Sequence, residues 1–188
     1  MDTGIILYIF RMNKIVFLDI DGVLNSELHY VEKSQQQLAD EIGYPLSEIS
    51  RSAVSLLNQI VEKTGAKVVI SSTWRLGRPV EELSSLLQKA GFEGEIIGIT
   101  PYLQYVAKCG CSDSVPRGCE IDAWITNNID WNSRKHLKYA ILDDDSDMMY
   151  HQRESFFLID GYCGLTYNVA ENIITHLNRF DESVNSDL

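Results

Sequence analysis

The chain of 188 residues has few cysteines and few prolines, four of each, and it has no long apolar run. Four cysteines in a chain of this length do not suggest the disulfide framework of a small secreted module. The apolar segment at residues 4–10 is far shorter than the about 20 residues of a membrane span. Asp2 precedes it, where a secretory signal carries positive charge. We therefore expect a cytoplasmic protein with reduced thiols and no membrane span.

Positive charge is also scarce, because 16 Lys and Arg stand against 27 Asp and Glu, a net charge of −11. This charge repels polyanions and argues against broad, non-specific binding to nucleic acid. It leaves room for a local basic pocket, and it suits a site that holds a divalent cation. We expect no stable nucleic-acid complex.

Three cysteines lie close enough in sequence to be considered as zinc ligands: Cys109, Cys111 and Cys119. Their spacings match no common zinc-binding pattern, and no histidine lies nearby to complete the site. Reduced thiols are the simpler interpretation.

Short apolar runs alternate with longer amphipathic stretches, which predicts a mainly parallel sheet covered by helices. The expected strands are residues 15–18, 67–70, 95–99, 139–142 and 156–159. The expected helices are about residues 50–64, 80–90, 118–127 and 168–179, and residues 100–118 are expected to be a loop or small lid. We expect one domain over residues 12–188. Residues 1–11 are then an N-terminal extension, either a short extra strand or residues upstream of a start at Met12.

Two of the expected strands end in aspartates, and a third ends in serines. In open parallel sheets, ligands bind outside the carboxyl ends of the strands. If these strands are neighbours, one crevice collects the side chains of Asp19, Asp21, Ser72, Asp143, Asp144 and Asp147.

Carboxylates gathered at one point repel one another unless a cation lies among them. Oxygen ligands from strand-end loops suit Mg²⁺, which is often shared with a phosphate. The spacing of Asp19 and Asp21 can direct both side chains at one ligand. One carboxylate could attack phosphorus, and the other could protonate the leaving group and then activate water. Taken alone, each motif also fits a polar turn or a helix N-terminus.

Together, these segments resemble three motifs of the haloacid dehalogenase-like (HAD) superfamily. The first is Val16-Phe17-Leu18-Asp19-Ile20-Asp21-Gly22-Val23, the second is Val68-Val69-Ile70-Ser71-Ser72, and the fourth is Ile141-Leu142-Asp143-Asp144 with Asp147. The third motif is a single Lys or Arg, for which Arg117 is our first choice and Lys108 the second. Further segments resemble a phosphatase-type branch that includes HAD domains from RNA-repair contexts: Leu24-Asn25, Ser72-Thr73-Trp74-Arg75, Gly98-Ile99-Thr100-Pro101, and Arg117-Gly118-Cys119-Glu120-Ile121 with Trp124.

The resemblance implies a Rossmann-like three-layer α/β/α sandwich and a role for each motif residue. Asp19 would be the nucleophile, and Asp21 would be the general acid and base. A general acid must be protonated when the leaving group departs, so we also expect Asp21 to be partly buried. Mg²⁺ would be bound by Asp19, the backbone carbonyl of Asp21 and Asp143, with Asp144 or Asp147 in support.

The same resemblance assigns Ser72 and Arg117 to the transferring phosphoryl oxygens. Ser71 would face the core, with its hydroxyl group satisfied locally. Arg75 would either reach a substrate phosphate or lie on the surface at a helix start.

Many HAD proteins carry a cap domain, but here the gaps between motifs are short. Residues 24–49 have room for little more than the usual hairpin flap, so we expect a minimal or absent cap. An open site suits a macromolecular substrate such as a phosphoprotein, including phosphotyrosine. Nucleotides and the 3′ or 5′ ends of nucleic acid are the alternative substrates, and small phosphoesters are a third class. A non-catalytic phosphate-recognition module fits less well, because every catalytic position is filled.

Overall fold

The computed structural model describes residues 14–36, 48–106 and 112–179, and the predicted extension at residues 1–11 lies outside them. Its centre is a five-stranded sheet in which all neighbouring strands are parallel. Across the sheet, the order is β3 (Ile96–Ile99), β2 (Lys67–Ile70), β1 (Lys14–Leu18), β6 (Lys138–Asp143) and β7 (Phe156–Leu158). All five predicted strands are confirmed.

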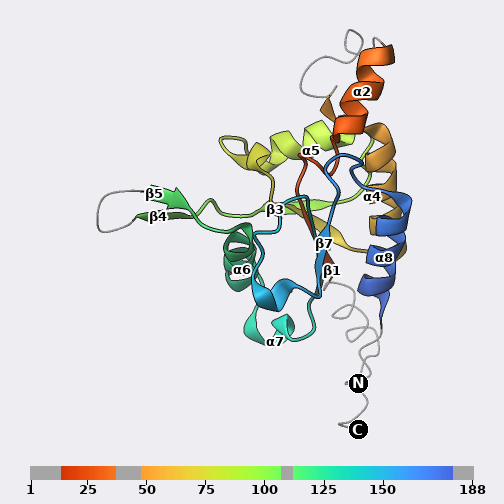
Figure 1. Ribbon diagram of the computed structural model, residues 1–188. Coiled ribbons are helices and arrows are strands. Elements are labelled where there is room, and N and C mark those ends of the chain that lie inside the picture. The colour runs from red at the N-terminus through yellow and green to blue at the C-terminus, as the bar shows by residue number, and fades with distance from the viewer. Residues whose placement is uncertain (1–13, 37–47, 107–111, 180–188) are drawn as a thin grey trace.

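Helices cover both faces of the sheet, so the central strands are buried on both sides. The helices are α4 (Arg51–Thr64), α5 (Val80–Lys89), α6 (Arg117–Asn128) and α8 (Tyr167–Asn178). Val16 and Leu18 of β1 pack in one core with apolar residues of α4, α5 and α8. Ile15 and Phe17 pack on the opposite face, against α6. Figure 1 shows α4 and α8 on one side of the sheet and α6 on the other. The predicted Rossmann-like three-layer fold is confirmed.

Local signals in the sequence account for the ends of α4. The hydroxyl of Ser50 accepts a hydrogen bond from the backbone N–H of Ala53, which satisfies one of the free donors at the helix start. Gly65 ends the helix with a φ of 72°, in the left-handed region that glycine adopts most readily.

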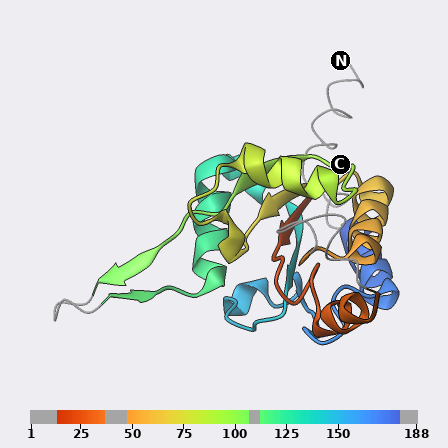
Figure 2. The same ribbon diagram turned by 90° about the horizontal axis from the view of Figure 1, so that it is seen from above.

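The predicted loop or lid at residues 100–118 contains an antiparallel hairpin of β4 (Gln104–Val106) and β5 (Ser112–Ser114). Figure 2 shows this hairpin projecting from the body of the domain. Its strands have no alternation of apolar and polar residues, so sequence periodicity could not reveal them. Lys108, Cys109 and Cys111 lie outside the described residues.

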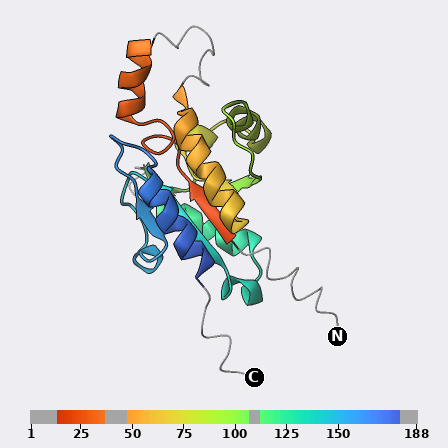
Figure 3. The ribbon, with the colours of Figure 1, turned by 90° about the vertical axis from the view of Figure 1, so that its right-hand side faces the viewer.

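The predicted hairpin flap after β1 is wrong for the described residues, which form helix α2 (Glu27–Gln36). The Ser26 hydroxyl accepts a hydrogen bond from the His29 backbone N–H at 3.2 Å, in the manner of a helix N-cap. The segment between β1 and this helix contains an isolated β-bridge, which pairs Asp21 with Asn25. Figure 3 shows α2 standing beside the body of the domain. Residues 37–47 lie outside the described part.

Three short elements had no sequence prediction. They are the 3₁₀ turns η2 (Thr73–Arg75) and η3 (Tyr150–Gln152) and the helix α7 (Trp131–Arg134). No helix among the described residues has the length and apolar character needed to span a membrane.

Candidate active site

The carboxyl ends of β1, β2 and β6 meet at the middle of the sheet edge, as predicted. Leu18 pairs with Ile70 of β2 and with Leu142 of β6. The next residue of each strand continues the pairing: the Asp19 N–H donates to the Leu142 carbonyl, and the Ser71 N–H donates to the Leu18 carbonyl, each at 2.9 Å. The side chains that follow these strands therefore start from one fixed edge.

Three carboxylates gather at this edge. Asp19, Asp143 and Asp144 each place one oxygen atom within 4.8 Å of the other two. Asp19 and Asp143 are buried, and Asp144 is exposed. Asp19 Oδ1 and Asp143 Oδ2 are buried oxygens with no hydrogen-bond partner among the described residues. Buried acceptors are normally paired, so these two point to a ligand between them.

Burial and mutual repulsion oppose the ionised form of this cluster. Burial and then the neighbouring Asp19 raise the pKa of Asp143 to about 7. Burial also raises the pKa of Asp19, although a hydrogen bond from Ser72 and the charge of Arg117 act in the opposite direction. A divalent cation would relieve both costs, and oxygen-only donors are those that Mg²⁺ prefers. These residues therefore fit the metal that the sequence predicts.

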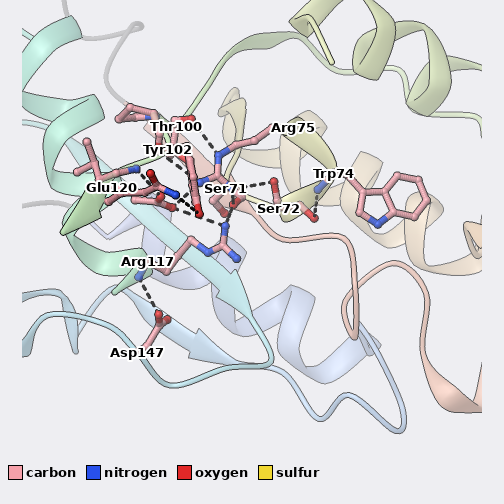
Figure 4. Close-up of polar contacts among 12 residues, drawn as sticks. Ser71, Ser72, Trp74, Arg75, Thr100, Tyr102, Arg117, Glu120 and Asp147 are labelled. Atoms are coloured by element: carbon pink, nitrogen blue, oxygen red, sulfur yellow. Dashed lines mark hydrogen bonds and ion pairs between the residues drawn. The ribbon is translucent and has the colours of Figure 1, made fainter. Parts of the chain in front are cut away.

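Asp147 has a different position from the cluster. Its Oδ2 accepts a hydrogen bond from the backbone N–H of Arg117 at 2.8 Å, which fixes the start of α6 (Figure 4). Of the two predicted supporting carboxylates, the structure brings Asp144 to Asp19 and Asp143. Gly22 leaves space for the Asp144 side chain, because a Cβ atom at position 22 would lie 2.1 Å from Asp144 Oδ2. The φ of Gly22 is +68°, in the left-handed region that favours glycine.

Ser72 and Arg117 both act on Asp19. Ser72 is fully buried, and its hydroxyl contacts Asp19. Arg117 Nε lies 3.7 Å from Asp143 Oδ2, and Arg117 Nη1 donates to the carbonyl of Ser71. The structure thus brings the first-choice third-motif residue to the cluster, whereas Lys108 lies outside the described residues.

The prediction that the Ser71 hydroxyl is satisfied locally is wrong. Its Oγ is buried and has no hydrogen-bond partner among the described residues. Ser71 contributes to the site through its backbone instead, because its carbonyl oxygen accepts hydrogen bonds from both Arg75 and Arg117.

The predicted surface position of Arg75 is wrong, because its guanidinium is buried. Its donors are used inside the protein, which does not favour the alternative of a contact with a substrate phosphate. It donates to the carbonyls of Ser71 at 2.6 Å and Thr100 at 2.9 Å, and it pairs with the Glu120 carboxylate. Figure 4 shows the side chains of Arg75, Glu120 and Arg117 converging around Ser71. No local signal in the sequence indicates this role of Glu120, since an acid in the first turn of a helix usually needs no partner beyond the helix dipole.

Asp21 is exposed, so the predicted partial burial is wrong. Its carboxylate is nevertheless held, because Asn25 Nδ2 donates to Oδ1 at 2.8 Å and Trp74 Nε1 lies 3.0 and 3.1 Å from the two oxygens.

Comparison with protein families gives one match over this same region. A family model described as the HAD domain in Swiss Army Knife RNA repair proteins matches residues 15–170. The chain belongs to this family. The HAD domain indicates a hydrolase of the phosphatase type that acts on phosphorylated substrates, and such domains typically use Mg²⁺. No curated protein and no solved structure matches the chain.

Proposed function

We propose that this HAD domain is a Mg²⁺-dependent phosphomonoesterase in which Asp19 is the nucleophile. The observation that carries the proposal is the environment of Asp19. Its buried carboxylate has one unpartnered oxygen, lies beside Asp143 and Asp144, and feels the Ser72 hydroxyl and the Arg117 charge. A nucleophile for phosphorus needs a free oxygen, a countercharge and donors for the phosphoryl group.

The proposed reaction has two steps. In the first, an Asp19 oxygen attacks phosphorus while the bond from phosphorus to the leaving oxygen breaks, and Asp21 gives that oxygen its proton. In the second, Asp21 takes a proton from water as the water oxygen attacks phosphorus. The bond from phosphorus to Asp19 then breaks, which releases inorganic phosphate and restores the carboxylate.

Mg²⁺ would be held by Asp19, Asp143 and Asp144, together with the backbone carbonyl of Asp21. The bound cation would offset the negative charge of the carboxylates and of the incoming phosphate. Ser72 and Arg117 would bind the transferring phosphoryl oxygens.

Arg75 and Glu120 support this arrangement without touching substrate. Glu120 Oε2 pairs with Arg75 and lies 3.8 Å from Arg117 Nη1, and both guanidinium groups bind the Ser71 carbonyl. These contacts limit the orientations open to Arg117, so its charge is directed to the cluster before substrate arrives.

The family match favours the terminal phosphate of RNA as the substrate. The matching model describes a domain of RNA repair proteins. A phosphoprotein remains the second candidate, because a net charge of −11 opposes the approach of a polyanion.

The first test is release of p-nitrophenol from p-nitrophenyl phosphate with Mg²⁺ and with EDTA. We expect turnover only with Mg²⁺ and none from Asp19→Asn, whose amide cannot form the acyl phosphate. A panel of 3′- and 5′-phosphorylated RNA oligonucleotides, nucleotides and phosphotyrosine peptides then ranks the substrates by kcat/KM. Binding of phosphorylated ligands without turnover would contradict the proposal and indicate a recognition module.

A further inference from the structure

The exposed Asp21 carboxylate is held by three hydrogen bonds from neutral side chains. Trp74 Nε1 is shared between its two oxygens at 3.0 and 3.1 Å, and Asn25 Nδ2 donates to Oδ1 at 2.8 Å. An indole N–H is a donor only, so this contact cannot reverse its direction. A carboxylate at the surface would otherwise sample several rotamers in water.

The side-chain amide of Asn25 is itself held in one orientation by a hydrogen bond from the backbone. The backbone N–H of Gly22 donates to Asn25 Oδ1 at 2.9 Å, which leaves Nδ2 facing the carboxylate. Asn25 is only 3% exposed. The turn between Asp21 and Asn25 thus supplies a donor with one orientation.

Trp74, the second donor to Asp21, is held by the turn after β2 that also carries Ser72, the proposed phosphate-binding residue. The backbone N–H of Trp74 donates to the Ser72 hydroxyl at 3.3 Å. Arg78 Nη1 donates to the Trp74 carbonyl at 3.0 Å, and the Arg78 guanidinium carbon lies 5.9 Å from the indole centroid. In Figure 4 the Trp74 ring points away from the group formed by Arg75 and Glu120.

We infer that Trp74 and Asn25 are positioning residues that orient Asp21 for proton transfer. The inference rests on the proposed function and extends it to residues outside the four motifs. Ser72 and Trp74 belong to one tight turn after β2, so the same turn places the phosphoryl ligand and the acid–base group. Proton transfer depends on the distance and angle to the leaving oxygen, and a fixed carboxylate keeps both.

The contact itself can be tested without any activity. We expect Asp21→Ala to move the indole ¹H–¹⁵N resonance of Trp74 and to speed its exchange with solvent, because the indole N–H loses its acceptor. Trp131 is the matched control: it is 79% exposed, it also lies beside an arginine, and no carboxylate of the described residues accepts from its ring nitrogen. An unchanged Trp74 resonance would overturn the inference.

The kinetic test compares leaving groups. In Trp74→Phe, we expect kcat/KM for an alkyl phosphate to fall about tenfold, as for loss of one hydrogen bond to a charged group. For p-nitrophenyl phosphate, whose leaving group needs little protonation, we expect a change below about twofold. Trp131→Phe is expected to leave both rates unchanged.

A double mutant separates positioning from packing. In the Asp21→Asn background, Trp74→Phe is expected to cause no further loss on the alkyl phosphate, because the group it orients can no longer transfer a proton. Equal losses on both substrates, or a further loss in the double mutant, would overturn this role and leave the phosphatase proposal intact. Absence of turnover in the wild-type protein would overturn the phosphatase proposal, and this role with it.

Discussion

Replacing Asp143 with asparagine should stabilise the metal-free protein at alkaline pH while it abolishes activity. Asp143 is 1% exposed and lies beside Asp19, and its pKa rises from 3.8 to about 7. At roughly 1.4 kcal/mol for each pKa unit, the ionised side chain costs about 4 kcal/mol of folding free energy. The amide of the variant would keep a carbonyl oxygen to accept from the Asp145 N–H, as Asp143 Oδ1 does at 3.0 Å.

The pH dependence has a definite sign. A carboxyl with a raised pKa binds its proton more tightly in the folded state, so stability falls as pH rises between 3.8 and about 7. Below this window the side chain is protonated in both states and costs nothing. Above it, we expect Asp143→Asn to gain about 2–4 kcal/mol, or roughly 5–10 °C in Tm for a chain of this size.

Thermal unfolding in EDTA at pH 5 and at pH 8 measures this difference, and Asp145→Asn in the same loop is the control. The advantage of the variant over the wild-type protein should be larger at pH 8 than at pH 5, because pH 5 lies inside the window between 3.8 and about 7 and only part of the cost is present there. Mg²⁺ should stabilise only the wild type. A variant that is less stable than the wild type at pH 8, or a difference that does not depend on pH, would refute this reasoning.

Three further predictions concern other parts of the site. Ca²⁺ should inhibit the Mg²⁺-dependent rate, because its larger and looser coordination disfavours in-line attack, and full activity in EDTA would contradict a metal site. Glu120→Gln leaves the Arg75 charge buried without its partner and should cost about 3 kcal/mol in urea unfolding, so a loss below about 0.5 kcal/mol would argue against a structural pair. Gly22→Ala should weaken Mg²⁺ binding measured by calorimetry, since its Cβ would collide with Asp144, and unchanged affinity would exclude Asp144 from the site.

Much of the fold could be predicted because its signals are local. Continuous apolar runs such as Ile15–Leu18 identify strands that are buried on both faces, and Gly65 identifies the end of a helix. The edge that carries the candidate active site is equally predictable, since polar residues directly after neighbouring parallel strands share one edge of the sheet. The hairpin of β4 and β5 has no such periodic signal, and it was missed.

The contacts behind the site could not be predicted, because they depend on distant parts of the chain. Arg75 is buried only because Glu120, 45 residues later, supplies its countercharge and Thr100 supplies a carbonyl. Nothing near Arg75 in sequence indicates that partner. The same holds for Trp74, whose bond to Asp21 joins residues 53 positions apart.

Chemical trapping of Asp19 tests the central claim most directly. Asp21→Asn, which lacks the base for the second step, is mixed with substrate and Mg²⁺, quenched in acid within milliseconds and reduced with borohydride. Mass spectrometry should then find homoserine at position 19 and unmodified side chains at Asp143 and Asp144, because only an acyl phosphate is reduced in this way. The same treatment of Asp19→Asn should give no homoserine. Rapid turnover of substrate by the wild-type protein without any modification at position 19 in either wild type or Asp21→Asn would contradict covalent catalysis by Asp19.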